Sequence, residues 1–383
     1  MNAPIKIRSY TILTNLTCNL RCTYCYENKC GKVNNLEDIQ DYIKGLYKQD
    51  FENNKENQEE MQIYLDIIGG ESLLHPELID GACQTALEMD EKYNIKKPFI
   101  LNMTTNAVLL LEPEVQETLL KWVKHLHLGI SIDGTKENHD KCRIDAEGNG
   151  SYDRAVKGYR WVQTILCPHK IGAKATFCHD TIKGYADGVI NLIDLGFRTI
   201  GANVIFEETW DDEDAMTIAS QMVKIIDYLF DNGLQDKVHI FQINNAEMDM
   251  RNYIAESGPK DRNHCGACTH MRCLGFNKEI YGCQRFATMK TPIPIGHMEN
   301  EDIVITNDAF CQEIAEQYNQ WPDECKKCPY VQQCPSCSAI PYEQDGPKAY
   351  FARKPQCGFT KAVVLARMYF KKRLLETETE QPK

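Results

Sequence analysis

Cys18-Asn19-Leu20-Arg21-Cys22-Thr23-Tyr24-Cys25 places three cysteines in one short segment, directly after the apolar run Tyr10 to Leu16, which we expect to be a strand. Thiolates at this spacing can converge on one small inorganic centre. A structural zinc site needs a fourth protein ligand and commonly uses two Cys-x2-Cys pairs. Three cysteines leave one position open, which suits an iron-sulfur cluster with one iron free. The alternatives are part of a zinc site or three packed cysteines, since a free cysteine behaves as a small hydrophobic residue.

The segment resembles the signature of the radical S-adenosylmethionine (SAM) superfamily, Cys-x3-Cys-x-aromatic-Cys, with Tyr24 as the aromatic residue. The resemblance implies that Cys18, Cys22 and Cys25 bind a 4Fe-4S cluster whose open iron chelates SAM. In that family, one electron from the reduced cluster cleaves SAM to methionine and a 5′-deoxyadenosyl radical. This radical abstracts hydrogen from an unactivated carbon.

The composition limits the size of the fold and the kinds of partner. The 383 residues exceed one ordinary core and favour two domains. A net charge of -12 argues against a nucleic-acid partner. The chain has no long apolar run and no N-terminal signal pattern, so we expect no membrane partner and a cytoplasmic location. In a reducing compartment, eighteen cysteines indicate metal binding or redox chemistry rather than a disulfide scaffold.

Strand-like runs alternate with amphipathic segments over residues 1–243. The expected strands are 10–16, 62–68, 98–104, 126–132, 171–178, 198–206 and 238–243, and the expected helices include 36–47, 76–87, 114–124, 151–165, 184–195 and 214–230. This alternation predicts a parallel sheet with right-handed crossovers. We expect Asn34 and Glu37 to cap the first helix and Pro76 to open the second. The resemblance specifies the closure, so the predicted fold class is α/β, with a partial (β/α)6 TIM-like barrel over residues 1–243.

Gly69-Gly70-Glu71 follows an expected strand, at the carboxyl end where parallel sheets bind ligands. Glycines let the backbone approach a ligand closely, and a carboxylate can pair with an ammonium group. By itself, such a tripeptide is more often a turn. In composition and in its position after the three cysteines, the tripeptide resembles the family's SAM-ammonium motif. The resemblance therefore assigns Gly69, Gly70 and Glu71 to SAM binding.

Ser131-Ile132-Asp133-Gly134, followed by His139-Asp140 and Arg143, resembles a segment of the sulfatase and peptide maturases of this superfamily. The resemblance implies that Ser131 reaches the SAM ribose and that Arg143 binds the SAM carboxylate, which suits a guanidinium fork. Read alone, the segment is a capping turn. We expect Asp133 and His139 to be structural, and Asn106 of Thr105-Asn106-Ala107, where the family often has Thr-Asn-Gly, is a further candidate.

Ten of the eighteen cysteines lie in the last 119 residues, after a polar stretch at 244–264 that we expect to be a linker. Cys325-x2-Cys328-x5-Cys334-x2-Cys337, followed by Cys357, resembles the SPASM domain, which carries two auxiliary 4Fe-4S clusters. Two Cys-x2-Cys pairs alone could also form a zinc ribbon, although their separation is short for one. We assign 265–357 to the SPASM domain and 358–383 to a helix, ending near Leu375, with a tail that we expect to be disordered.

The family's crossed ligand pattern assigns these cysteines to two clusters. It implies that Cys325, Cys328, Cys334 and Cys357 bind one cluster, whereas Cys265, Cys283 and Cys337 bind the other, with Cys268 or Cys273 as its last ligand. The chain departs from the motif at Lys278, where the motif has Gly, at Gly282, where Pro is common, and in the short Cys334–Cys337 spacing. The remaining cysteines are expected to be packing residues: Cys30, Cys83, Cys142, Cys167, Cys178 and Cys311.

The resemblance implies an enzyme that modifies polypeptides, with three 4Fe-4S clusters and SAM as cofactors. We expect it to cross-link a ribosomally made precursor peptide through a sactipeptide- or ranthipeptide-like thioether. A carbon-carbon cyclophane-type cross-link is the alternative. Sulfatase maturases carry a basic Asp after the cysteine equivalent to Cys283, where this chain has Gln284, which cannot take a proton at neutral pH. A sulfatase-type maturase and a non-enzymatic metal or electron-transfer protein stay open as further alternatives.

Two kinds of protein partner are implied besides the substrate. Reduction of the clusters implies a flavodoxin or ferredoxin electron donor. Only nine residues precede the first expected strand. We therefore expect leader recognition to fall to a separate leader-binding protein or to the barrel and C-terminal surfaces, or to be absent.

Overall fold

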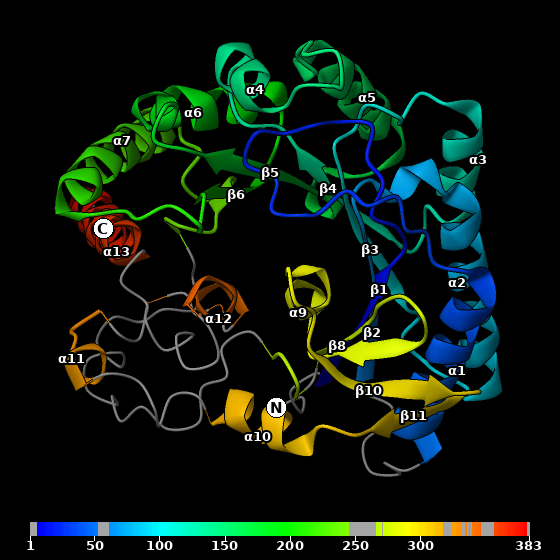
Figure 1. Ribbon diagram of the computed structural model, residues 1–383. Coiled ribbons are helices and arrows are strands. Elements are labelled where there is room, and N and C mark those ends of the chain that lie inside the picture. The colour runs from blue at the N-terminus through cyan, green and yellow to red at the C-terminus, as the bar shows by residue number, and fades with distance from the viewer. Residues whose placement is uncertain are drawn as a thin grey trace.

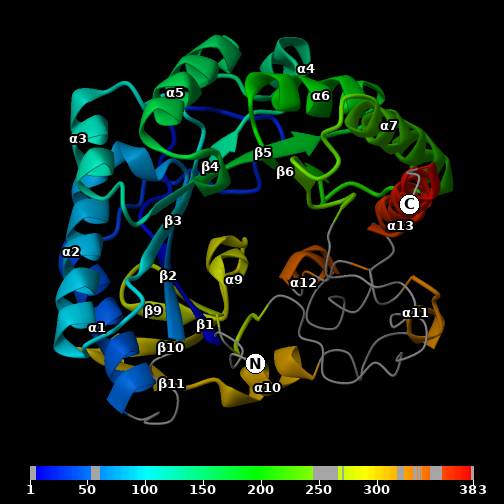
Figure 2. The ribbon, with the colours of Figure 1, turned by 180° about the vertical axis from the view of Figure 1, so that it is seen from behind.

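The computed structural model describes residues 6–52, 61–244, 266–269, 271–316, 323–330, 334, 337, 339–345 and 356–380. A curved parallel sheet with helices on its outer face dominates the molecule (Figures 1 and 2). Its strands follow chain order: β1 (Lys6–Leu13), β2 (Met61–Ile68), β3 (Ile100–Thr105), β4 (Leu126–Ser131), β5 (Ile171–Phe177), β6 (Thr199–Val204) and β7 (His239–Ile240). All seven expected strands are present, so the predicted α/β class is confirmed.

The helices between the strands cover the outer face of the sheet (Figure 2). They are α1 (Leu36–Glu52), α2 (Pro76–Lys92), α3 (Pro113–Lys121), α4 (Lys136–Cys142), α5 (Tyr152–Ile165), α6 (Tyr185–Leu195) and α7 (Asp212–Asp231), with short 3-10 turns η2 (Ser72–Leu74), η3 (Pro168–Lys170) and η4 (Ile182–Gly184). Alternate residues of β2 such as Ile63 and Leu65 are fully buried. Burying one such side chain contributes about 1.5–3 kcal/mol, so this apolar layer holds helices and sheet together.

Two local predictions at the start of the fold need correction. The first strand ends at Leu13 rather than Leu16, because Asn15 leaves the sheet and bridges to Val33. The cap of α1 is Asn35 rather than Asn34: the Asn35 carboxamide oxygen accepts the Asp38 backbone N–H at 2.8 Å. The Asn34 amide instead donates to the carbonyl of Leu13 at 3.1 Å and thereby ties the end of β1 to α1. Pro76 opens α2 as expected.

The C-terminal region continues the same sheet instead of forming a separate one. Strand β8 (Met271–Leu274) pairs in parallel with β1, and β9 (Glu279–Tyr281), β10 (Pro294–Glu299) and β11 (Asp302–Ile305) extend it as an antiparallel meander. The short helices α9 (Gln284–Thr288), α10 (Asp308–Ala315), α11 (Asp323–Lys326) and α12 (Ala339–Asp345) follow. The linker expected at 244–264 lies outside the described residues from 245 on, so that boundary stays a prediction.

The last helix, α13 (Cys357–Glu380), packs along α7 (Figure 1). The Tyr369 hydroxyl donates to Asp227 of α7 at 2.8 Å. The helix continues five residues past Leu375, where the sequence predicted disorder. Lys372 and Glu376, one helical turn apart, form an ion pair at 3.5 Å across this point. Across the described residues, no helix has the length and apolarity that crossing a membrane requires.

Candidate functional site

The three-cysteine loop follows β1 and is held from two sides by backbone hydrogen bonds. On one side, the Arg21 N–H donates to the Ile144 carbonyl at 2.6 Å and the Thr23 N–H donates to the Cys142 carbonyl at 2.9 Å. On the other side, the Glu71 N–H donates to the Thr17 carbonyl at 2.8 Å. Leu20 is buried beneath the loop. The loop is therefore fixed at the carboxyl ends of β1 and β2.

The Cys18 sulfur already receives hydrogen bonds that suit a thiolate. The Leu20 backbone N–H lies 3.4 Å and the Asn106 amide nitrogen 3.8 Å from its Sγ. Burial raises the pKa of Cys18 to about 11 and also raises the pKa of Cys22, so these thiols ionise only beside a cationic centre. This donor set fits an iron-sulfur cluster. Among the described residues, no three His, Cys, Asp or Glu side chains are grouped to hold a single metal ion.

The Gly69–Glu71 turn packs directly against the cysteine loop. A Cβ at Gly70 would lie 2.1 Å from the Thr17 carbonyl oxygen, so only glycine permits this contact. The buried Glu71 carboxylate accepts hydrogen bonds from the Thr105 hydroxyl at 2.8 Å and the Asn106 N–H at 2.8 Å. Its side chain thus connects the ends of β2 and β3, and its contact with a SAM ammonium stays a prediction.

Asp133, after β4, organises the opposite wall of the site. Its carboxylate accepts hydrogen bonds from Arg143 Nε at 2.9 Å, from the Tyr24 hydroxyl at 2.5 Å and from the Thr176 N–H at 2.9 Å. Arg143 is 8% exposed and its guanidinium lies over the Tyr24 ring, 5.4 Å from the centroid. Burial lowers the Arg143 pKa, but the charge of Asp133, the nearby Tyr24 and Cys22 and the hydrogen bond to Asp133 together raise it by more, so the guanidinium stays charged. Ser131, the last residue of β4, is buried at the same strand end.

His139 holds the Asp133 turn through its neutral ring. Nδ1 accepts the Asp133 backbone N–H at 3.2 Å, and Nε2 lies 2.9 Å from the Ser151 hydroxyl, which donates to the Arg143 carbonyl. This pattern assigns the ring proton to Nε2. Complete burial lowers the pKa of His139 to about 4. Asp133 and His139 therefore position Arg143.

Glu71 and Arg143 place opposite charges on the two sides of the cysteine loop. Burial raises the pKa of Glu71, while its hydrogen bonds and the Arg143 charge act in the opposite direction. The two groups are thus close enough to interact electrostatically. A buried carboxylate and a buried guanidinium beside the same loop suit a zwitterionic ligand with one ammonium and one carboxylate.

Three of the departures from the family motifs have local explanations. Ala107 (φ 66°) and Lys278 (φ 62°) both occupy left-handed backbone positions where the motifs have glycine. An L-residue there costs about 1 kcal/mol, which the fold tolerates. At the third departure, a Cβ on Gly282 would lie 2.2 Å from the Cys268 sulfur. Gly282 therefore makes room for Cys268.

Four C-terminal cysteines lie near one another in the structure. Burial raises the pKa of Cys357, and the neighbouring Cys334, Cys325 and Cys328 thiols raise it further. The turn before α13 is fastened to the barrel on both sides of Cys357. The Gln356 amide donates to the Phe206 carbonyl and the Gly358 N–H to the Trp210 carbonyl, both at 2.9 Å. The cluster that these cysteines would bind is thereby attached to the β6–α7 loop, and their role as ligands stays a prediction.

The second auxiliary set is placed only in part. Cys268 lies beside Gly282, the residue that precedes Cys283, and its sulfur shares a hydrogen bond with Cys311 of α10. The sequence predicts Cys311 to be a packing residue, and no motif around it indicates this contact with Cys268. Cys273 is fully buried on β8, near Cys283. Cys265 lies outside the described residues, and Cys337 is half-buried at the edge of the core.

Arg285 is a site residue that the sequence reading did not find. Its Nη2 donates to Glu207 at 2.7 Å and to Glu343 of α12 at 2.9 Å, and its guanidinium lies 4.1 Å from the centroid of the Tyr26 ring. Tyr26 follows Cys25 directly. One side chain therefore connects the cysteine loop, the β6–α7 loop and the C-terminal region. Only its position two residues after Cys283 could have singled it out.

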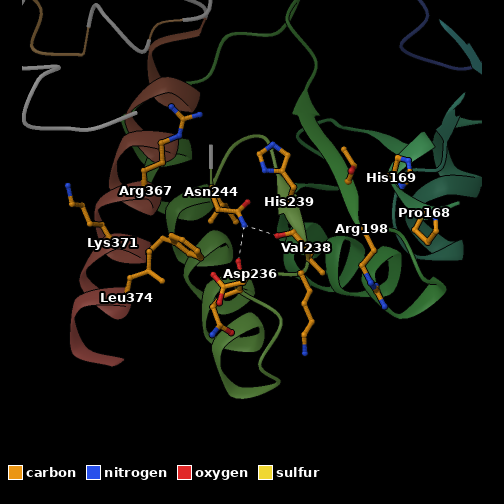
Figure 3. Close-up of a pocket in the computed structure, with 15 residues that line it drawn as sticks. Pro168, His169, Arg198, Asp236, Val238, His239, Asn244, Arg367, Lys371 and Leu374 are labelled. Atoms are coloured by element: carbon orange, nitrogen blue, oxygen red, sulfur yellow. Dashed lines mark hydrogen bonds between the residues drawn. The ribbon is translucent and has the colours of Figure 1, made fainter. Parts of the chain in front are cut away.

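A cavity of about 820 Å³ lies at the other end of the strands (Figure 3). Its walls include residues that precede β5, β6 and β7, among them His169, Arg198 and Lys237, and a face of α13 around Phe370. The cysteine loop follows the carboxyl end of β1, whereas these residues stand at the amino ends. None of the predicted SAM-binding residues lines this cavity, so it is separate from the site described above.

Comparison with known proteins shows a likeness to sulfatase-maturating enzymes in sequence and in fold. No family model matches it. It is 22% identical over 346 residues to the serine-type anaerobic sulfatase-maturating enzyme of Bacteroides thetaiotaomicron, covering 83% of this chain and 78% of that protein.

Two solved structures extend the likeness. The fold matches anSMEcpe with bound AdoMet at a TM-score of 0.69 and 17% identity, over 96% of this chain and 98% of that one. It matches Streptococcus suis SuiB bound to the precursor peptide SuiA at a TM-score of 0.57 and 15% identity, over 92% of this chain and 76% of that one. The predicted fold class is therefore confirmed, and the resemblance to radical SAM maturases is confirmed as a likeness of sequence and fold.

Proposed function

We propose that this protein is a radical SAM enzyme that modifies a peptide or protein substrate. The observation that carries the proposal is the cysteine loop flanked by Glu71 and Arg143, buried groups of opposite charge at the carboxyl end of the barrel. Cys18, Cys22 and Cys25 would hold a 4Fe-4S cluster, Glu71 with the Gly69–Gly70 backbone would face the SAM ammonium, and Arg143 the SAM carboxylate. When bound, the cluster supplies the electron that cleaves SAM to methionine and a 5′-deoxyadenosyl radical.

The residues around the cluster site would orient SAM and limit side reactions. Asp133 and Tyr24 hold the Arg143 guanidinium on one side, while Thr105 and Asn106 hold the Glu71 carboxylate on the other. Fixed charges need no rearrangement when the ligand binds, so their electrostatic contribution is retained. Arg285 would keep the C-terminal region closed over the loop. Ser131, at the end of β4, would contact the ribose.

We infer that the finer reaction is an oxidative cross-link in a ribosomally made peptide, with a thioether favoured. Forming this bond removes a hydrogen atom from a substrate carbon, a proton from a substrate thiol and one further electron, so the substrate loses two hydrogens in total. Bound SAM would supply the radical that accepts the hydrogen atom, and a bound auxiliary cluster would accept the electron. The auxiliary clusters would be held by the Cys325, Cys328, Cys334 and Cys357 set and by the Cys265, Cys268, Cys283 and Cys337 set. A flavodoxin or ferredoxin would supply the first electron.

A sulfatase-type maturase is the second candidate, because the chain is similar to such enzymes over most of its length. Gln284 weighs against it, because a carboxamide cannot serve as a base at neutral pH. Changing Gln284 to Asp would supply the missing base. If the substrate is a sulfatase-like Ser or Cys peptide, Gln284→Asp should raise aldehyde formation by about tenfold or more, detected with a hydrazide probe. A cross-linking enzyme would gain no aldehyde product from this change.

The decisive experiment uses anaerobically purified protein with reductant, SAM and a co-expressed candidate peptide. We expect 5′-deoxyadenosine together with a peptide lighter by two hydrogens and with one fewer free thiol. Cys18→Ala is the control for SAM cleavage, and Cys83→Ala is the matched cysteine control, since Cys83 is buried in α2 away from the loop. Protein that carries zinc instead of iron and leaves SAM intact would contradict the proposal.

A further inference from the structure

Two cysteines assigned to packing lie against each other beside the cysteine loop. Cys142 is the last residue of α4 and Cys178 is the first residue after β5, and their sulfurs are 3.9 Å apart. Cys142 is 5% exposed, whereas Cys178 is partly accessible. They are 36 positions apart in the chain, so only the fold brings these two thiols together.

The surroundings of the pair favour reaction between the two sulfurs. The Cys178 N–H donates to the Thr181 hydroxyl at 3.0 Å, and the Thr181 N–H donates back to the Cys178 carbonyl at 2.9 Å, which fixes the backbone on that side. Closing the gap to a bond of about 2.05 Å requires the sulfurs to approach by about 1.9 Å. The hydrogen bond between the two thiols lowers the pKa of Cys178 and raises the pKa of Cys142, so Cys178 is the thiol that ionises first and attacks.

We propose that Cys142 and Cys178 form a dithiol site that small-molecule disulfides, such as oxidised glutathione, convert to an intramolecular disulfide. The Cys178 thiolate attacks the small disulfide and releases one thiolate. Cys142 then loses its proton and attacks the mixed disulfide, which releases the second thiolate. The small disulfide accepts the two electrons, and the two protons lost by the protein thiols protonate the two released thiolates. In a reducing compartment such a bond is transient and responds to oxidant.

Oxidation of this pair would act on the cysteine loop through the backbone. The Cys142 carbonyl accepts the Thr23 N–H at 2.9 Å, and Thr23 stands between Cys22 and Cys25. The next residue, Arg143, carries the hydrogen bond to Asp133. Drawing Cys142 toward Cys178 shifts both contacts, so the disulfide form should bind SAM more weakly, by about fivefold or more. This consequence rests on the proposed function, whereas disulfide formation does not.

The test uses the cluster-loaded full chain without oxygen, incubated over a series of reduced-to-oxidised glutathione ratios. Free thiols are then alkylated, and the protein is digested for mass spectrometry, while iron content and absorbance report that the clusters stay intact. We expect a linked Cys142–Cys178 peptide that dithiothreitol removes. Cys178→Ser should abolish it and leave Cys142 alkylated, and the exposed Cys167 should give only a glutathione adduct.

Three outcomes would overturn the proposal or part of it. If Cys178 carries glutathione while Cys142 stays free at every ratio, or if both thiols are alkylated throughout, the dithiol assignment is wrong. If the disulfide forms but SAM affinity is unchanged, measured by equilibrium dialysis, the coupling to the loop is wrong. A reduced enzyme that never cleaves SAM would instead contradict the proposed function and leave the mass-spectrometric result standing.

Discussion

Replacing Asp133 with Asn tests whether this carboxylate, rather than the cysteines alone, holds the SAM-binding wall together. Asp133 is 1% exposed and receives Arg143 Nε, the Tyr24 hydroxyl and the Thr176 N–H. Asn has the same shape but only one acceptor oxygen. Whichever way its amide turns, the NH2 group meets either the Arg143 and Tyr24 donors or the Thr176 N–H. The substitution therefore leaves a buried donor facing another donor and a buried cation without its anion.

The magnitude follows from the burial of the pair. Breaking a buried ion pair by removing one charge costs about 3–5 kcal/mol, because the remaining charge is left in a poorly solvating interior. For a chain of 383 residues, the unfolding entropy is about 0.8 kcal/mol per kelvin. We therefore expect the melting temperature to fall by about 4–6 °C. SAM affinity should fall by tenfold or more, because Arg143 is no longer fixed toward the site.

The assay is thermal and urea unfolding of reconstituted protein without oxygen, followed by circular dichroism, with SAM affinity measured by equilibrium dialysis. Asp80→Asn is the matched control. Asp80 also accepts two side-chain donors, Lys121 Nζ and Trp122 Nε1 (2.7 Å), but its side chain is 37% exposed. An exposed pair contributes about 0–1 kcal/mol, so this variant should melt within about 1 °C of the parent.

The reasoning fails if Asp133→Asn is no less stable than Asp80→Asn. Such a result would mean that Arg143 finds another partner or enough water in the folded protein. Normal stability combined with weak SAM binding would mean that Asp133 contacts the ligand directly instead of positioning Arg143.

Three further changes probe the same site. Burial lowers the pKa of His139 to about 4, below its ordinary value of 6.5. Between pH 6.5 and 4 the unfolded chain therefore binds a proton that the folded protein does not, so the free energy of unfolding is highest above pH 6.5 and falls by about 3 kcal/mol as the pH drops toward 4. His139→Gln should flatten that loss in urea unfolding between pH 7 and 4.5, and an unchanged slope would contradict the assignment. Gly70→Ala would place a Cβ against the Thr17 carbonyl oxygen. We expect the variant to lose the cluster of the cysteine loop, about four iron atoms per chain, and all SAM cleavage, whereas its circular dichroism spectrum should stay near that of the parent protein. Asn106→Ala removes an N–H donor to the Cys18 sulfur. Because one hydrogen bond contributes about 1 kcal/mol, the reduction potential of the cluster should fall by about 40 mV, measured by a redox titration followed by electron paramagnetic resonance. An unchanged potential would show that the contact is not retained in the cluster-loaded site.

The sequence by itself determined the order of elements and the cysteine loop. Strand and helix periods are properties of neighbouring residues, so all seven strands could be placed within a few positions from apolar spacing. The Cys18–Cys25 motif is local as well, because one short loop carries all three thiols. Pro76 could be placed at the start of α2 for the same reason.

Only the tertiary structure decided which distant residues meet. The parallel pairing of β8 with β1 joins segments about 260 positions apart, and no local pattern specifies it. The same holds for Arg285 with Glu207, for Cys268 with Cys311, and for Cys142 with Cys178. Asn35 replaced Asn34 as the cap of α1 because Asn34 is used to fasten Leu13. Side-chain partners are chosen by burial and packing across the whole chain, and that choice is made in three dimensions.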